Sequence, residues 1–215
     1  MRLAAVVSLL IGLYAGMAMA QVDKKPLEKW LAAQKNYRSA HAEFVQTRKL
    51  PALNKPLVNK GEMWAKRPDK FLWVMGKPAK VTVLRNAAGY LYLDAEKNEA
   101  IKMGSDSKYA RQFEMLTGEM GEDLAEFEKN FRIEKIETRK NIYYTTLQPV
   151  NRRFRKRVPW MILAIDTRTN QTAGFDVHLQ DKTVIETRFT RYRLNTPVDD
   201  GIFKADTTGY KVKSK

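Results

Sequence analysis

The chain is 215 residues long, contains no cysteine, and carries a net charge of +15 from 39 basic and 24 acidic residues. This length suits one domain with a substantial core, and the missing cysteines exclude a fold held by disulfides. In an intracellular protein so basic a balance would point to nucleic acid. Behind an export signal it points to anionic lipid surfaces or acidic proteins instead.

Residues 1–20 have the three parts of a cleavable signal peptide. Arg2 supplies a positive start, residues 3–13 are apolar, and Ala18-Met19-Ala20 forms a cleavage site. The apolar part is shorter than the ~20 residues that span a membrane, with an uncleaved N-terminal anchor as the alternative. Gln21 stands where a lipid-anchored protein would need a cysteine. We therefore expect an exported, soluble protein without a lipid anchor, whose single domain covers residues 21–215.

The first predicted element of the mature chain is a helix. Pro26 suits a first helical turn, and Leu27, Trp30 and Leu31 follow at helical spacing. The period of the apolar residues then changes to two, which predicts strands joined by short turns. These strands lie near 39–47, 58–65, 71–75, 80–85, 89–94 and 98–103.

Two helices are predicted in the middle of the chain, over 105–120 and after Gly121, because apolar residues recur there at helical spacing. Strand periodicity resumes near 131–138, 141–148, 158–166, 172–179, 182–193 and 202–212. Open sheets of about ten strands curl or close. The predicted fold is therefore mainly β: an unclosed, strongly curved antiparallel half-barrel of about ten or eleven strands, with an N-terminal helix and a mid-chain helical pair as its lid. A sandwich whose helices fill an ordinary core is the alternative.

The predicted strand at 71–75 is apolar on both faces. Phe71, Leu72, Trp73, Val74 and Met75 follow one another, although successive strand residues point to opposite faces. Both faces must therefore be covered. We expect one face to pack in the protein's own core and the other to face the lid or a bound lipid.

The sequence contains no pattern that indicates catalysis. His41 and His178 are each isolated in a predicted strand, and no metalloprotease, nucleophile-elbow or phosphate-loop motif occurs. Ser105 precedes Lys108 at a spacing used by some acyl enzymes, but the companion motifs are missing and a helix cap explains the serine. We predict a binding protein and no enzyme, without catalytic residues, metal or cofactor.

A basic run separates two of the predicted strands. It is either a solvated loop or a docking patch for anionic headgroups or an acidic partner. Phe154 and Trp160, within and beside the run, would suit such an interface. The candidate docking residues are Arg152, Arg153, Arg155, Lys156 and Arg157.

Several short motifs occur in the order found in one protein family. Residues 42–95 contain in turn Phe44, Gln46, Thr47, Gly61, Trp64, Lys66-Arg67-Pro68, Phe71 and Trp73. A weaker pattern follows in the C-terminal third, in DTRTNQTAGFDV and RYRLNTPVDDGIF. With the signal peptide, this order resembles the periplasmic outer-membrane lipoprotein carrier family, LolA. The middle helices and the C-terminal ADTTGYKV depart from the family pattern.

The resemblance implies a lidded, unclosed barrel, in agreement with the periodicity. It also implies a periplasmic chaperone that binds the acyl chains of lipoproteins and carries them from the inner to the outer membrane. Its implied partners are acylated lipoprotein cargo, an ATP-driven inner-membrane transporter that releases lipoproteins, and an outer-membrane lipoprotein receptor. We expect a monomer that contacts membrane surfaces transiently and binds no nucleic acid.

Two other functions fit the sequence. A carrier of the same fold could serve another acylated product, such as a glycolipid or a polyene ester. An adaptor without a cavity could tether envelope components through its basic face.

The apolar pattern and the resemblance together suggest a lipid-binding cavity. Its candidate residues are Phe44, Met63, Trp64, Phe71, Trp73 and Met75 in the strands, and Tyr109, Phe113, Leu116, Leu124 and Phe127 in the lid. By resemblance, Arg67 is the latch that holds the lid shut, and Phe71 contacts the donor transporter. A planar guanidinium suits a latch because it can bridge carbonyls, including those left unpaired at a helix end. Since the lid sequence departs from the family, the acceptors of Arg67 are left open.

Overall fold

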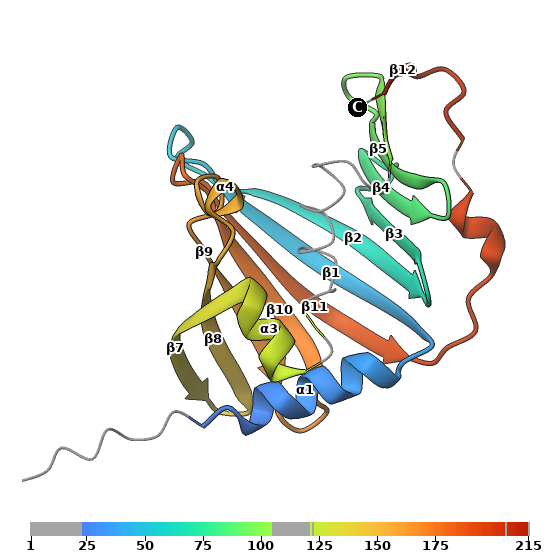
Figure 1. Cartoon of the computed structure of the whole chain (residues 1–215). Helices are drawn as coiled ribbons and strands as arrows, with labels where there is room; N and C mark the ends of the chain where they lie inside the picture. Colours follow the sequence, from blue (N-terminus) through green and yellow to red (C-terminus); the bar gives the residue numbers. More distant parts are fainter. Residues whose placement is uncertain (1–22, 105–120, 122, 205, 215) are drawn as a thin grey trace, which may run out of the picture.

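The computed structural model describes residues 23–104, 121, 123–204 and 206–214. Figure 1 shows one strongly curved sheet with a long helix lying across it. The predicted signal peptide and the first of the two middle helices, 105–120, lie outside the described residues. Within the described ranges, no helix is long and apolar enough to span a bilayer.

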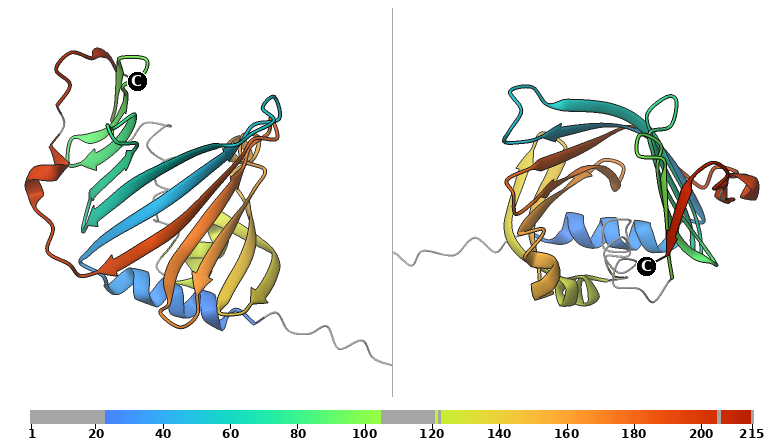
Figure 2. Two further views of the ribbon diagram at one scale, coloured as in Figure 1. Left: turned by 180° about the vertical axis from the view of Figure 1, so that it is seen from behind. Right: turned by 90° about the horizontal axis from the view of Figure 1, so that it is seen from above.

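The long helix, α1 (Lys25–Asn36), forms where the spacing predicted it. A proline stands in its first turn. Leu27, Trp30 and Leu31 are buried and, being three and four residues apart, share one face. That face is turned toward the concave side of the sheet, and α1 crosses the sheet at its lower end in Figure 1 (Figures 1 and 2).

The strands before the middle segment follow the predicted order and form an antiparallel meander. They are β1 (Ser39–Lys49), β2 (Leu57–Lys66), β3 (Lys70–Met75), β4 (Val81–Asn86), β5 (Gly89–Asp94) and β6 (Glu99–Met103).

After the middle segment, a short helix, α3 (Leu124–Asn130), precedes a second meander. The Asp123 side chain caps α3 by accepting from the Glu126 backbone N–H at 2.9 Å. The strands that follow are β7 (Phe131–Arg139), β8 (Ile142–Pro149), β9 (Trp160–Asp166), β10 (Gln171–His178) and β11 (Val184–Leu194). Between β8 and β9 the basic run forms a helical turn, α4 (Arg152–Arg155), which was not predicted.

The C-terminal prediction was wrong in its detail. Instead of one strand at 202–212, the chain forms a 3-10 turn, η1 (Asp200–Phe203), and a separate strand, β12 (Lys211–Ser214). β12 pairs with β6 in parallel, so the sheet is mixed rather than antiparallel throughout. Parallel pairing requires a crossover, which the segment between β11 and β12 supplies.

The twelve strands found in the described residues form one sheet, in the order β12-β6-β5-β4-β3-β2-β1-β11-β10-β9-β8-β7. The two meanders are joined by β1 and β11, which pair over ten residues of β1, from Ala40 to Lys49. β12 and β7 remain the two edges. This confirms the predicted unclosed half-barrel and excludes the sandwich.

The two apolar faces of β3 are covered in different ways. Phe71 belongs to a concave-side cluster with residues of β1 and β2, and Trp73 packs against it. Leu72 and Val74 lie on the opposite face, in a cluster with Phe203 of η1. The C-terminal segment, which wraps around this outer face in Figure 1, is therefore the cover that the sequence left unidentified.

The largest part of the core lies between α1, α3 and the second meander. Leu27 and Leu31 of α1 meet Phe127 of α3 and Leu147 of β8 there. This packing anchors α1 to one half of the sheet and leaves its last turn near the other half, where the candidate site lies.

Candidate functional site: a pocket on the concave face

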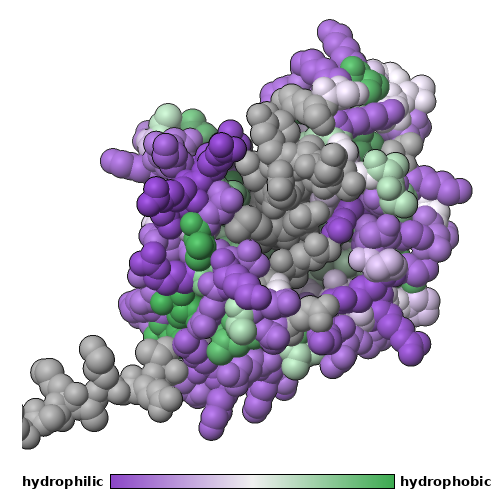
Figure 3. All heavy atoms as spheres, in the orientation of Figure 1, coloured by the Kyte–Doolittle hydropathy of each residue, from purple (hydrophilic) through white to green (hydrophobic). Residues whose placement is uncertain are grey.

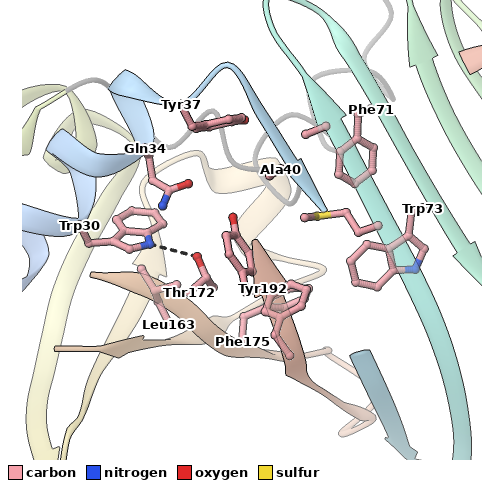
Figure 4. A pocket seen from close by; sticks show the side chains of 13 residues that line it. Trp30, Gln34, Tyr37, Ala40, Phe71, Trp73, Leu163, Thr172, Phe175 and Tyr192 are labelled. Carbon is pink, nitrogen blue, oxygen red and sulfur yellow. Dashed lines mark hydrogen bonds between the residues drawn. The ribbon is translucent and has the colours of Figure 1, made fainter. Parts of the chain in front are cut away.

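A pocket lies between α1 and the concave face of the sheet (Figure 4). It contains about 650 Å³ of empty space, including the part open to solvent. Its walls come from the end of α1, from β1 to β3 and from β9 to β11. The lining residues are Trp30, Gln34, Tyr37, Ala40, Met63, Ala65, Phe71, Trp73, Leu163, Thr172, Phe175, Phe189 and Tyr192.

Aromatic rings form most of the wall on the sheet side. Trp73 is at their centre, with its ring stacked on Phe44 at 3.9 Å between centroids. Phe175 and Phe189 lie 6.2 and 6.5 Å from it. Because these rings come from β1, β3, β10 and β11, the wall exists only when the two meanders are joined. Such a surface binds apolar ligands through dispersion and the release of water.

Gly61 explains how Phe44 reaches Trp73. Gly61 in β2 pairs with Phe44 in β1. A Cβ atom on Gly61 would lie 2.2 Å from Phe44 Cζ and 2.4 Å from the Val74 carbonyl oxygen. No side chain fits at this distance. The glycine therefore lets the Phe44 ring lie across β2 and support the pocket wall from behind.

A small polar network lies on the opposite wall. The Trp30 indole N–H donates to the Thr172 hydroxyl at 3.0 Å (Figure 4). Burial raises the pKa of the Tyr192 hydroxyl, which also bonds Thr172, so this phenol is neutral in the pocket. The Gln34 side-chain nitrogen is buried and has no hydrogen-bond partner among the described residues. The described part of the pocket thus offers the Gln34 amide as a donor beside an apolar wall.

Arg67 joins the β2–β3 turn to the end of α1. Its Nη2 donates to the Gln34 carbonyl oxygen at 2.9 Å, in the last turn of the helix. Its guanidinium lies over the Tyr37 ring, 5.0 Å from the centroid. Carbonyls in a last helical turn lack helical partners, so the arginine satisfies one of them. The sequence left open which groups accept hydrogen bonds from Arg67. Among the described residues, the acceptor is a carbonyl of the N-terminal helix.

Of the strand residues predicted to line the cavity, some line the pocket and others do not. Met63, Phe71 and Trp73 line the pocket. Phe44 supports the wall from behind, and Met75 shares the face of Trp73 without lining the pocket. Each of these five residues lies on the concave side.

Trp64 is a correction. It packs with the outer-face cluster and its ring stacks on His41 at 5.1 Å. Trp64 and Met63 are neighbours in β2, so their side chains must point to opposite faces, and only one of the two can line the cavity.

The predicted lid residues also divide. Phe127 is fully buried in the core beneath α1, and Leu124 packs against the same core, so neither lines the pocket. α3 is seven residues long and packs against α1 and β7 instead. Tyr109, Phe113 and Leu116 lie outside the described residues.

Besides the small Ala40 and Ala65, eight lining residues were missed, because their contribution depends on pairings far apart in sequence. Trp30 has the helical spacing of a core residue, and Phe175 and Phe189 have the alternation of strand residues. Nothing local shows that β10 and β11 face α1 across the same cavity as β3. The eight are Trp30, Gln34, Tyr37, Leu163, Thr172, Phe175, Phe189 and Tyr192.

The basic run has a defined local structure. The Asn151 side chain caps α4 by accepting from the Arg153 and Phe154 backbone N–H groups. Phe154 is buried in the main core and is therefore unavailable to an interface, which corrects the prediction. Arg155 donates to the Pro149 carbonyl at 3.1 Å, while Arg152, Arg153, Lys156 and Arg157 are exposed.

The fold and the pocket define a half-barrel able to hold an apolar ligand. Residues 35–206 match the family model described as outer membrane lipoprotein carrier protein LolA. The chain belongs to this family, which confirms the resemblance seen in the sequence. Among curated proteins, no sequence matches significantly.

Similar solved structures share little sequence with the chain. An uncharacterized conserved protein from Thermus thermophilus is 9% identical with a TM-score of 0.53, over 89% of this chain and 98% of that one. A LolA superfamily protein from Nitrosomonas europaea is 10% identical with a TM-score of 0.43, over 85% and 97% of the two chains. A putative outer membrane lipoprotein-sorting protein domain from Vibrio parahaemolyticus is 8% identical with a TM-score of 0.46, over 83% and 94%.

Proposed function

We propose that this protein is a periplasmic chaperone that binds the acyl chains of lipoproteins in the concave pocket and carries them from the inner to the outer membrane. Membership of the LolA family supports a role as a carrier of lipids or lipoproteins in the cell envelope. The aromatic pocket between α1 and the sheet is the observation that carries the proposal. The protein acts by binding, without a chemical step.

The energetics of an acyl chain set the demands on such a carrier. Burying one methylene is worth ~0.8 kcal/mol, so a chain of about 15 methylenes prefers an apolar phase by roughly 12 kcal/mol. A carrier needs a comparable apolar surface, or the cargo stays in the membrane. Because the membrane offers the same gain, extraction needs an energised donor and delivery needs a tighter-binding acceptor. We therefore propose an ATP-driven inner-membrane transporter and an outer-membrane receptor as partners.

The polar side of the pocket suits a ligand with a carbonyl near its acyl chains. A buried donor without a partner costs about 1–3 kcal/mol, and a bound carbonyl would remove that cost. The Gln34 amide nitrogen, which has no hydrogen-bond partner among the described residues, could donate to an ester or amide carbonyl of the cargo. The acylated end of a lipoprotein contains both groups.

Native mass spectrometry of protein purified from cells that make acylated lipoproteins tests the proposal. We expect bound acylated species on the wild type and on Thr169→Glu, which places a charge in an exposed turn. Phe175→Glu, which places the same charge in the pocket wall, should carry none while its circular dichroism stays native. Wild-type protein that is consistently empty would contradict the proposal.

The same measurement separates the other functions. Glycolipid or polyene ester in place of lipoprotein would identify a carrier of another acylated product. Protein that neither carries lipid nor binds a fluorescent fatty-acid probe would favour the adaptor.

A further inference from the structure

Three chain connections meet at one end of the sheet, away from α1. β1, β8 and β10 run toward this end and β2, β9 and β11 run back from it, since neighbours in this part of the sheet are antiparallel. Figure 1 shows these connections at the upper left, and the view from behind in Figure 2 shows them at the upper right. We call residues 48–60, 150–160 and 179–183 the basic rim.

The basic rim concentrates the positive charge of the protein. It contains ten basic residues and one acidic residue, a net charge of +9 out of +15 for the whole chain. Lys49 is paired with Glu186, which lies just outside the rim. The acidic member, Asp181, is held by the turn and accepts from the Thr183 backbone N–H at 2.9 Å. The side chains of Arg152 and Arg153 in α4, and of Lys156 directly after it, are exposed.

The same rim gathers exposed apolar side chains. In the described part of the chain six large hydrophobic residues are exposed, and five of them belong to the rim: Leu53, Leu57, Val58, Val150 and Trp160. Leu53 is 47% exposed and Val58 59% exposed. Figure 3 shows hydrophobic atoms among hydrophilic ones at this upper left end. Exposed apolar residues scattered singly need no explanation, but their concentration at one charged end does.

We propose that the basic rim docks the protein on an anionic lipid bilayer. A bilayer interface offers phosphates to lysine and arginine and an apolar layer to leucine, valine and tryptophan at adjacent depths. Protein interfaces, in contrast, have cores depleted of charge, whereas here basic and apolar side chains alternate along the connections. Docking by this rim is a property of a surface separate from the pocket and does not depend on which cargo the pocket holds.

Vesicle sedimentation measures this docking directly. Wild-type protein should bind phosphatidylglycerol–phosphatidylethanolamine vesicles, release them as salt is raised, and bind phosphatidylcholine vesicles far less. Each lysine or arginine near an anionic surface contributes about fivefold to binding. The triple variant Arg152→Gln, Arg153→Gln, Lys156→Gln should therefore bind at least about tenfold more weakly.

A matched variant removes the same charge from the opposite end of the sheet. Arg139, at the end of β7, is exposed, and so are Lys140 and Arg168 in the turns after β7 and β9. Changing all three to glutamine should leave vesicle binding within about threefold of the wild type, because these charges stay far from the bilayer in the proposed orientation. An equal loss of vesicle binding in the two triple variants would show that only the net charge of the protein matters. That result would overturn the proposal.

A depth measurement tests insertion of the apolar residues. The chain has no cysteine, so a polarity-sensitive fluorophore can be attached to Leu53→Cys or, as a control, to Lys140→Cys. Anionic vesicles should shift the emission of the Leu53 label to the blue and leave the Lys140 label unchanged. Vesicle binding without cargo would reject the proposed function and keep this inference. Cargo binding without any vesicle binding would support the proposed function and overturn docking on a bilayer. The basic rim would then be assigned to an acidic protein partner.

Discussion

Arg67 connects the sheet to the last turn of α1. The side chain contributes one hydrogen bond to the Gln34 carbonyl and a cation–π contact with Tyr37. Its backbone N–H also donates to the Arg38 carbonyl at 2.9 Å. A hydrogen bond from a charged donor is worth ~1.5–3 kcal/mol and a cation–π contact ~0.5–1 kcal/mol at an exposed site. These contacts hold the end of α1 beside the β2–β3 turn, and we propose that they favour a closed arrangement of α1 over the pocket.

Arg67→Leu should therefore retain acylated cargo more tightly and deliver it more slowly, because closure no longer competes with the bound chain. Arg67→Lys should restore delivery only in part, since an ammonium group lacks the planar, forked geometry of a guanidinium. Transfer of a labelled lipoprotein to acceptor-bearing membranes measures both steps. Arg168→Leu, in an exposed turn, is the matched control and should behave as the wild type. Equal transfer by Arg67→Leu would show that Arg67 has no role in release.

Tyr192 predicts how stability depends on pH. Burial raises its pKa above the ordinary value of 10.0, and burial does the same for Tyr143. A raised folded-state pKa gives stability that is complete below pH 10 and lost as the pH rises above it, because only the unfolded state then ionises. Each tyrosine should contribute a slope of about 1.4 kcal/mol per pH unit there. Urea unfolding between about pH 8 and 11.5 should show a shallower slope for Tyr192→Phe, and an unchanged slope would contradict the assignment.

At the scale of the strands, side chains alternate between the two faces of the sheet, so each aromatic residue contributes to only one face. In β2 and β3 the side chains that line the pocket are on the concave face, and those that pack with the C-terminal segment are on the outer face. Trp73 and Trp64 are therefore the same residue type on opposite faces of adjacent strands. They form a natural pair for separating cargo binding from stability.

Trp73→Leu should lower affinity for an acyl-chain probe by about tenfold, because the centre of the aromatic wall is lost. Trp64→Leu should lower the free energy of unfolding by about 1–3 kcal/mol and leave probe affinity within about twofold. Fluorescent fatty-acid titration and chemical denaturation measure the two effects. Equal loss of affinity in both variants would place Trp64 in the cargo site after all.

The whole molecule depends on its C-terminal segment to cover the outer face of the first meander, β1 to β6. Phe203 is 3% exposed and packs with Leu72, Leu84 and Leu91, which belong to three different strands. The Asn86 side chain donates to the Phe203 carbonyl at 3.1 Å and fixes this position. Without the cover, an apolar surface on one side of the sheet would meet water while the pocket occupies the other.

Phe203→Ala should lower the free energy of unfolding by about 3–5 kcal/mol and increase binding of a hydrophobic dye. Val212→Ala, at an exposed position of β12, should change stability by no more than about 0.5 kcal/mol. Chemical denaturation measures the stability of both variants, and dye fluorescence measures the apolar surface exposed in Phe203→Ala. Unchanged stability in Phe203→Ala would mean that the segment is not a structural cover.

Local patterning was sufficient for most of the elements, and the order of motifs was sufficient for the family. Helical spacing predicted α1, alternation predicted β1 to β11 to within a few residues, and the number of strands required a curved sheet. The helical turn α4 and the 3-10 turn η1 were missed because Asn151 and Asp199 act as caps over too few residues to produce a period.

The site depended on long-range pairing. β1 must pair with β11 before Phe175, Phe189 and Tyr192 share a pocket with Trp73, and these residues are about a hundred positions apart in sequence. The same holds for the C-terminal cover, because hydrophobicity shows that a face must be buried without showing which segment buries it. Periodicity is a property of neighbours along the chain, whereas a cavity is a property of neighbours in space. The sequence therefore predicted the strands that build the pocket, and only the curvature and register of the sheet selected the side chains that line it.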